Sequence, residues 1–515
     1  MERWVIAMKK ADFYAIGEKY HISPILARLI RNRDIVGDEN IDFYLNGTIA
    51  DLYDGMLMQD MDRAVEILSE KIREEKRIRV IGDYDIDGIN ATYILQEGLS
   101  GLGAEADTDI PDRIRDGYGL NRMLIDRAID DGIDTIVTCD NGIAATEEIA
   151  YGKEKGLTVI VTDHHEVPYV EMNGEKEYLL PKADAVVDPH RPDCGYPFKG
   201  LCGAAVAYKL VEALYNVMQK DPEDMDYLME NVAIATVGDV MDLTGENRIF
   251  VKQGLEMLKR TKNQGLKALI ECTGIDVERL NTYHIGFVLG PCINASGRLD
   301  TAKRALELLN VRARRDAVML AEDLKALNDS RKEMTERGVA EAVHMIETTS
   351  LKDDKVLVVY LPDCHESIAG SPTTSSTRSP VRRFRFTRGM SPGAAWQRTR
   401  PFSARTPSRP SRRSSSAHRP SRPNRVGISS SISLIGALLP GIRSPQWCLK
   451  SSILYFPPLG KPPQDEISEE RPISRPVPGK MGLAKPGQML YTEIEHPFYS
   501  QIRKPGVPAP VRFMG

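Results

Sequence analysis

The sequence predicts an α/β protein built around a parallel β-sheet, with helical segments before and after it. Three observations support this class. Apolar runs of strand length occur at Arg77–Gly82, Thr135–Cys139 and Leu157–Thr162. Stretches with helical periodicity separate them, and each run ends at a polar turn. Because the chemistry of parallel α/β sheets collects at the carboxyl ends of the strands, these turns are where a site is expected.

The segments around the sheet are predicted to be mainly helical. Apolar residues recur at intervals of three and four in Ser23–Ile30 and Met61–Leu68, within the first 75 residues. Residues 199–346 have the same character, most clearly at Arg312–Asn328, and Lys355–Tyr360 begins a new strand. We therefore expect a helical segment at 1–75, the α/β domain at 76–245, a helical connector at 246–350, the start of a second α/β domain at 351–370, and an irregular tail at 371–515.

Composition excludes several classes of protein. The chain has 515 residues, 42% of them hydrophobic and 27% charged, as expected for a soluble protein of several domains. No apolar run approaches the roughly 18 residues that span a bilayer, and the N-terminus lacks the layout of a signal peptide. The seven cysteines are scattered without a CxxC pair, which argues against a disulfide framework and against zinc fingers. We expect a cytoplasmic protein without a membrane partner.

Charge divides the chain in two. Residues 1–370 carry 44 Lys and Arg against 67 Asp and Glu, whereas residues 371–515 carry 24 against 6. Between Glu366 and Asp465 there is no acidic residue, and the tail is rich in Ser, Pro and Arg up to about Arg425. Two interpretations stay open: a disordered basic arm able to bind nucleic acid, or the product of a reading-frame error. We assign no function to this tail.

The first polar turn is Asp83–Gly88, with the sequence DYDIDG. Aspartates at alternate positions leave an extended segment on one side, so two or three carboxylates could converge on a cation. Gly88 would then turn the chain into a helix that begins near Asn90. A calcium loop would need a glutamate about six residues after the glycine, and none stands there. Taken alone, an ordinary acidic turn or helix cap explains the segment equally well.

Three further positions extend this pattern: Asp140 in the turn DNG, the triplet Asp163-His164-His165, and Asp239 at the end of an apolar helical stretch. Singly, each is better explained as an Asx turn, a surface turn or a helix cap. Carboxylates suit Mg and Mn, imidazole suits Mn, Zn and Fe, and Asp163 could orient a histidine. Together, clusters at three strand ends match a site with one or two metals that hydrolyses phosphoryl groups. The sequence contains neither a P-loop nor a GxSxG elbow.

The order DYDIDG, CDNG, DHH and ATVGDV is similar to the four motifs of the DHH phosphoesterase superfamily. Segments at Pro111–Arg113, Leu201–Ala204 and Gly290–Leu299 resemble its RecJ-type single-stranded-DNA-specific exonucleases. The resemblance covers about residues 1–370. It implies a DHH domain, a helical connector and the start of a DHHA1-like domain. It also implies one or two Mn²⁺ or Mg²⁺ ions and hydrolysis of single-stranded DNA from the 5′ end.

The resemblance further implies individual roles. Metal ligands would be Asp83, Asp85, Asp87, Asp140, His164 and Asp239, with Asp140 bridging two ions. Catalysis would rest on Asp140, His164 and His165. Substrate would be held by Arg113, Asn294, Arg298 and His365.

Two departures from the family pattern qualify this picture. Cys292 stands where the family usually has an arginine, so one expected phosphate contact is missing. The glycine-rich segment of the second domain is not found after residue 370. Two alternatives stay open: a phosphodiesterase of the same superfamily that acts on oligonucleotides or cyclic dinucleotides, and an inactive metal-binding or DNA-binding remnant. The sequence does not identify any protein partners that the chain has.

Overall fold

The computed structural model describes residues 9–112, 119–172, 175–349 and 361. Apart from Leu361, the expected second α/β domain and the tail lie outside the described residues. Contacts divide the described chain into two compact units. One contains residues 9–52 and 244–249, and the other contains residues 53–243 and 250–349. The second unit carries the sheet and every candidate site residue that the structure describes.

The smaller unit contains the helices α1 (Phe13–Tyr20), α2 (Pro24–Asn32) and α3 (Asp38–Asn46). Ser23 caps α2 by accepting a hydrogen bond from the Leu26 N–H, and Pro24 occupies the first helical position, where its missing N–H costs nothing. The helix predicted from the apolar spacing at Ser23–Ile30 is therefore confirmed.

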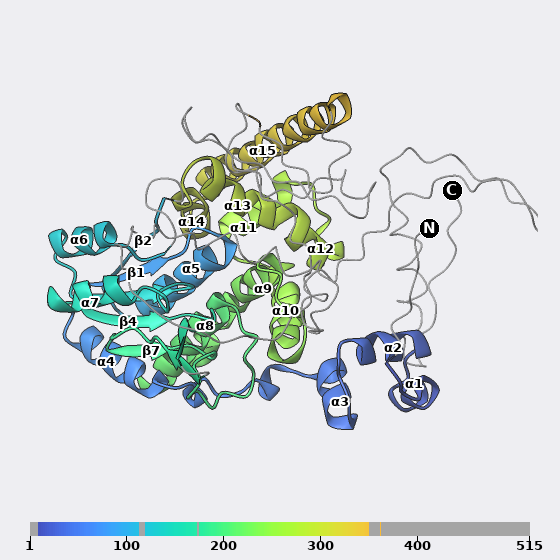
Figure 1. Cartoon of the computed structure of the whole chain (residues 1–515), viewed down its shortest axis with the longest axis horizontal. Helices are drawn as coiled ribbons and strands as arrows, with labels where there is room; N and C mark the ends of the chain where they lie inside the picture. The colour runs from blue at the N-terminus through green and yellow to red at the C-terminus, as the bar shows by residue number, and fades with distance from the viewer. Residues whose placement is uncertain (1–8, 113–118, 173–174, 350–360, 362–515) are drawn as a thin grey trace, which may run out of the picture. The chain divides into compact units, whose positions relative to one another are not determined.

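A five-stranded parallel sheet forms the centre of the larger unit, in the order β2-β1-β3-β4-β7 (Figure 1). Its strands are β1 (Ile78–Gly82), β2 (Ala106–Asp109), β3 (Thr135–Cys139), β4 (Thr158–Thr162) and β7 (Ala185–Val187). The predicted parallel sheet is thus confirmed. The strand order reverses between β1 and β3, and such a switch point opens a crevice at the carboxyl ends of the strands. Asp83 follows β1 and Asp140 follows β3, so both lie at this point.

Helices cover both faces of the sheet. On one face lie α5 (Ile86–Gly101) and α8 (Gly203–Val217), and on the other lie α6 (Arg122–Asp130) and α7 (Thr146–Glu154). Because side chains alternate along a strand, one set packs against α6 and α7 and the other against α5 and α8. All residues of β1, β3 and β7 are buried, as expected for parallel strands covered on both sides. Apolar packing on both faces therefore holds the strand ends in fixed positions.

Residues 199–346 are mostly helical, as predicted. The remaining elements of the described chain include others that precede this range. They are η1 (Ile49–Asp51), η2 (Gly55–Leu57), α4 (Met61–Arg73), the antiparallel pair β5 (Tyr169–Met172) and β6 (Glu175–Tyr178), η3 (Pro222–Leu228), α9 (Met229–Gly238), α10 (Gly245–Leu258), α11 (Gln264–Cys272), η4 (Val277–Arg279), α12 (Thr282–His284), the π-helical turn η5 (Ile285–Leu289), α13 (Gly290–Leu299), α14 (Lys303–Asn310) and α15 (Arg314–Thr348). Among the described residues, no helix combines the length and the apolar character needed to cross a bilayer.

The structure corrects the prediction for the first acidic turn. The helix after β1 begins at Ile86 rather than near Asn90, because Asp85 caps it: Oδ1 accepts hydrogen bonds from the N–H groups of Asp87 (2.9 Å) and Gly88 (3.2 Å). The three aspartates therefore do not alternate along an extended segment, and Asp87 lies in the first turn of α5. Gly88 serves close packing rather than a turn, since a Cβ there would lie 2.4 Å from the Asp83 carbonyl oxygen.

Candidate metal centre

Asp140 occupies the tight turn that follows β3. Its backbone φ of 58° lies in the left-handed region, which is costly for a residue with a side chain. Gly142, with a φ of 115°, continues the turn. The buried Asn141 amide holds the turn in place by donating hydrogen bonds to the carbonyl oxygens of Ile81 (3.0 Å) and Cys139 (2.9 Å). The turn is therefore anchored to the ends of both β1 and β3.

Asp87 joins the starts of two helices. From the first turn of α5, its carboxylate accepts hydrogen bonds from the N–H groups of Gly203 (2.7 Å) and Ala204 (2.8 Å), which begin α8. Burial raises the pKa of this carboxylate overall, although the N–H groups at the start of α8 act to lower it. Each carboxylate oxygen has two lone pairs, and these hydrogen bonds leave Asp87 able to bind a further group.

Gly203 allows α8 to approach the Asp140 turn. A Cβ at position 203 would lie 2.6 Å from Asp140 Cβ and 2.9 Å from Asp140 Cα, which is closer than real Cβ atoms come to other atoms. The glycine is therefore a steric requirement for bringing the Asp87 and Asp140 carboxylates together.

Asp163 organises the turn after β4. Its Oδ1 accepts hydrogen bonds from the N–H groups of His164 (2.7 Å) and His165 (3.2 Å) and lies 2.7 Å from His165 Nδ1. Its Oδ2 accepts a hydrogen bond from the Ile143 N–H at 2.9 Å. Burial acts to raise the pKa of Asp163, but the hydrogen bond and charge of His165 lower it overall. Burial also opposes protonation of His165, yet the contact with Asp163 raises the pKa of the imidazole to about 9. Asp163 therefore orients His165, as the triplet predicted.

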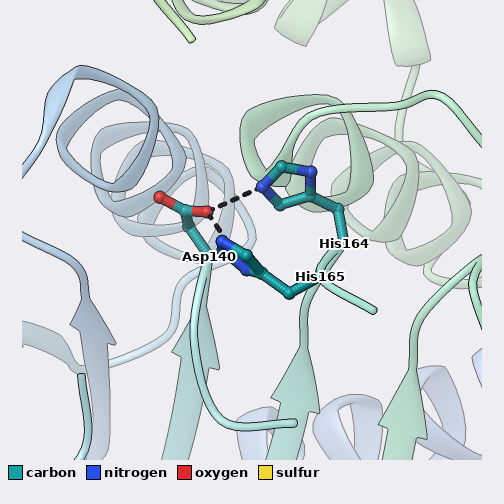
Figure 2. A group of neighbouring side chains, drawn as sticks. All are labelled: Asp140, His164 and His165. Atoms are coloured by element: carbon teal, nitrogen blue, oxygen red, sulfur yellow. Dashed lines mark hydrogen bonds and ion pairs between the residues drawn. The ribbon is translucent and has the colours of Figure 1, made fainter. Parts of the chain in front are cut away.

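His164 and His165 both turn toward Asp140, as Figure 2 shows. His164 Nε2 lies 3.0 Å from Asp140 Oδ1 and 3.4 Å from Asp87 Oδ2. His165 Nδ1 lies 3.9 Å from Asp140 Oδ1, and its side chain is 46% exposed. One carboxylate oxygen of Asp140 is thus within reach of two imidazoles that come from the neighbouring strand end.

The predicted residues gather into three overlapping groups in which one donor atom from each member lies within 4.8 Å of the others. These groups are Asp140 with His164 and His165; Asp87 with His164 and Asp239; and Asp83 with Asp85 and Asp140. Asp140 and His164 each belong to two of them. The structure therefore brings together all six residues predicted as metal ligands, from the ends of β1, β3, β4 and α9.

The electrostatics of this cluster favour a bound cation. Burial, together with the neighbouring Asp85 charge, raises the pKa of Asp83 to about 8, and Asp83 Oδ1 has no hydrogen-bond partner in the described structure. Burial and the Asp87 carboxylate likewise raise the pKa of Asp140 well above its usual range. A buried cluster of carboxylate oxygens beside an imidazole nitrogen fits an ion such as Mn²⁺ or Mg²⁺.

A cavity of about 310 Å³ adjoins the acidic cluster. It is lined by Asp83, Tyr84, Asp85, Ile86, Gly238, Asp239, Asn294, Gly297 and Arg298. Asn294 Oδ1 accepts a hydrogen bond from the Ile86 N–H at 2.9 Å, so this side chain also supports the start of α5. A Cβ at Gly297 would lie 2.6 Å from the Tyr84 carbonyl oxygen, which shows how closely α13 packs on the first acidic turn.

Three other predicted positions fall differently. Arg113 and His365 lie outside the described residues. Cys292, which stands where the family usually has an arginine, is buried, and its Sγ lies 3.6 Å from Asn328 Nδ2 of α15. Cys292 therefore packs between two helices and does not line the cavity.

Sequence reasoning missed the turn Asp188-Pro189-His190 after β7. Asp188 is fully buried; Oδ1 accepts a hydrogen bond from the His190 N–H at 2.7 Å, while Oδ2 has no partner in the described structure. Burial, reinforced by the Asp163 charge, raises the pKa of Asp188 to about 7. The available signal was a fourth apolar run that ends at an acid, but β7 has only three residues and was too short to register as a strand.

Comparison with known proteins identifies relatives of this chain. Residues 77–236 match the DHH family, N-terminal domain. The chain is 37% identical over 357 residues to the single-stranded-DNA-specific exonuclease RecJ of Bacillus subtilis, covering 69% of this chain and 44% of that protein. It is 34% identical over 363 residues to the RecJ of Salmonella typhimurium, covering 68% of this chain and 61% of that protein. The chain thus spans about half the length of these curated relatives.

Solved structures show that this fold is shared with RecJ proteins. A manganese complex of RecJ from Thermus thermophilus aligns with a TM-score of 0.59 and 28% identity, over 73% of this chain and 52% of that one. A second structure, an exonuclease RecJ bound to manganese, aligns with a TM-score of 0.55 and 30% identity, over 64% of this chain and 80% of that one. A magnesium complex from Thermus thermophilus aligns with a TM-score of 0.54.

Proposed function

Since this chain belongs to the DHH family, in its RecJ branch, we propose that it is a metal-dependent exonuclease that hydrolyses single-stranded DNA from the 5′ end. The single observation that carries the proposal is the convergence on Asp140. Carboxylates and imidazoles from separate strand ends approach one buried aspartate, and such a set of oxygen and nitrogen donors is typical of hydrolytic metal sites.

We propose that the six clustered residues hold one or two Mn²⁺ or Mg²⁺ ions. They are Asp83, Asp85, Asp87, Asp140, His164 and Asp239, with Asp140 shared between ions because two of the three groups contain it. A bound divalent ion lowers the pKa of water and neutralises charge on a phosphoryl group. The unpartnered Asp83 oxygen and the raised pKa of Asp140, which burial and the neighbouring carboxylates cause, support this assignment because a bound cation would stabilise both ionised carboxylates.

The protein's own residues would position the substrate. His165 is half-exposed and held by Asp163, and its raised pKa favours an imidazolium that faces a phosphate. Arg298 lines the cavity beside Asp239, where a guanidinium can bind phosphate through two hydrogen bonds. Asn294 lines the same cavity. We also assign Arg113 and His365 to substrate binding on the resemblance alone.

The test uses the full chain, Mn²⁺ and a single-stranded 30-nucleotide DNA labelled at either end. The proposal predicts mononucleotides released from the 5′ end, a much slower reaction on a blunt duplex, and no reaction with a chelator present. Asp140→Ala should lose at least a hundredfold in rate, while Asp316→Ala, at an exposed carboxylate on α15, should keep the wild-type rate. Equal rates in these two variants would refute the assigned centre, and a preference for dinucleotides would refute the substrate.

A further inference from the structure

Two aromatic rings stack on the surface of the larger unit. The ring centroids of Tyr283 and Phe287 are 5.0 Å apart with an interplanar angle of 27°, and the side chains are 49% and 45% exposed. Exposed aromatic rings that lie nearly parallel present π faces of the kind on which nucleobases stack.

This pair belongs to the same helical segment as the cavity. Residues 282–299 run without a break through α12, the π-turn η5 and α13, because every residue at the two junctions has right-handed helical backbone angles. From Leu289 to Gly297, only Pro291 and Asn294 escape burial. Accessible positions continue at 291, 294 and 298, three and four residues apart, while between 282 and 288 only Ile285 is buried, so Tyr283 and Phe287 lie on the broader accessible start of the same segment. This accessible face carries Tyr283 and Phe287 at one end and the cavity residues Asn294 and Arg298 at the other.

The packing fixes this segment against the candidate centre. A Cβ at Gly290 would lie 3.1 Å from Ile86 Cδ1, and a Cβ at Gly286 would lie 3.6 Å from a methyl group of Val237, two residues before Asp239. The aromatic pair is therefore held on the helix that supports the first acidic turn.

We propose that Tyr283 and Phe287 form a stacking platform for the bases of single-stranded DNA whose reacting phosphate lies in the cavity; the inference rests on the proposed function. Phe287 precedes Asn294 by seven residues, or at most about 10 Å along the segment, since an α-helix rises 1.5 Å per residue and the π-helical turn rises less. A stacked strand advances about 3.4 Å per nucleotide, so the platform meets bases roughly three nucleotides from the reacting phosphate. Every base has a π face, so the contact is independent of sequence, whereas in a duplex those faces are already stacked.

The test measures binding of a 12-nucleotide oligothymidylate with a 3′ fluorophore by anisotropy, with Mn²⁺ present and hydrolysis-resistant linkages at the 5′ end. Loss of both rings in Tyr283→Ala/Phe287→Ala should weaken binding roughly 5- to 30-fold. Replacing the third to fifth nucleotides by abasic residues should weaken wild-type binding by a similar factor and leave the double variant unchanged. Tyr283→Leu/Phe287→Leu, which keeps apolar bulk without rings, should behave like the alanine variant.

Matched controls separate the possible outcomes. Tyr169→Ala removes a tyrosine of similar exposure (48%) from β5 and should not change binding. With Mn²⁺, both platform variants should hydrolyse a dinucleotide at the wild-type rate, because that substrate ends before the platform. Wild-type affinity in both platform variants, or an abasic penalty that persists in them, would overturn the inference and assign the rings to another partner. If the wild-type protein hydrolyses neither substrate, the proposed function fails while the binding result still decides the platform.

Discussion

Replacing Gly203 by alanine tests the geometry of the candidate centre without removing any proposed ligand. The new Cβ would lie 2.6 Å from Asp140 Cβ, against backbone-anchored atoms that cannot rotate away. The start of α8 therefore has to move, and with it the two N–H groups that bind the Asp87 carboxylate at 2.7 and 2.8 Å. Overpacking costs about 1–3 kcal/mol. Weakening hydrogen bonds to a charged group adds to this, so we expect the free energy of unfolding to fall by roughly 2–4 kcal/mol.

The effect on activity should exceed the effect on folding. A displacement of about 1 Å in a catalytic arrangement can cost a hundredfold in rate. We expect Gly203→Ala to hydrolyse single-stranded DNA at least 100-fold more slowly at saturating Mn²⁺, at a temperature where circular dichroism shows the protein folded. Titration calorimetry should show weaker Mn²⁺ binding, because Asp87 and Asp140 both shift.

Gly195 supplies the matched control. A Cβ there meets no heavy atom within 4 Å, so Gly195→Ala should stay within about 0.5 kcal/mol of the wild type and keep full activity. If Gly203→Ala behaves like Gly195→Ala in stability, Mn²⁺ affinity and rate, then the close approach of α8 to Asp140 is not a property of the molecule.

Three further predictions follow from individual contacts. Burial raises the pKa of Glu230 from 4.5 to about 7. The contribution of this group to folding stability is therefore fully present below pH 4.5 and is lost as the pH rises through 7. In chemical denaturation, the free energy of unfolding of Glu230→Gln should match that of the wild type at pH 4 and exceed it by about 3 kcal/mol at pH 8. Asn294→Ala leaves the Ile86 N–H without its acceptor and should cost about 1–3 kcal/mol and weaken Mn²⁺ binding, whereas unchanged calorimetry would show that Asn294 does not support the site. Mn²⁺ at a hundred times its Kd should stabilise the wild type by about 2.7 kcal/mol, visible as a higher melting temperature that a chelator reverses, and Asp140→Ala should show no such gain.

The sequence predicted the parts of the site that local pattern controls. β1, β3 and β4 are apolar runs that end at acids, and the resulting clusters meet because parallel strands share an edge. The prediction failed where local signals are weak. β2 has the polar sequence ADTD at the edge of the sheet, so it was not predicted as a strand. β7 has only three residues, so neither this strand nor the turn at Asp188 was predicted.

Contacts between segments that are distant in the sequence also could not be predicted. Asp87 binds the start of α8 across 116 residues, and Asn294 binds Ile86 across 208 residues. No spacing rule links such positions, because they meet only after the helices pack. The helix cap that the sequence left open at the first acidic turn is what the structure shows, because Asp85 caps α5.

The hydrogen bond from Ile86 to Asn294 bears on how short a working fragment of this chain can be. A polypeptide that stops at residue 245, the boundary drawn from sequence pattern, would keep all six clustered residues and lose α13 with its Asn294 acceptor. It would also lose Gly297, against which the Tyr84 carbonyl oxygen packs. We therefore expect the smallest fragment that keeps the candidate metal centre intact to extend through Leu299, so that residues 246–299 support the centre and are not a spacer.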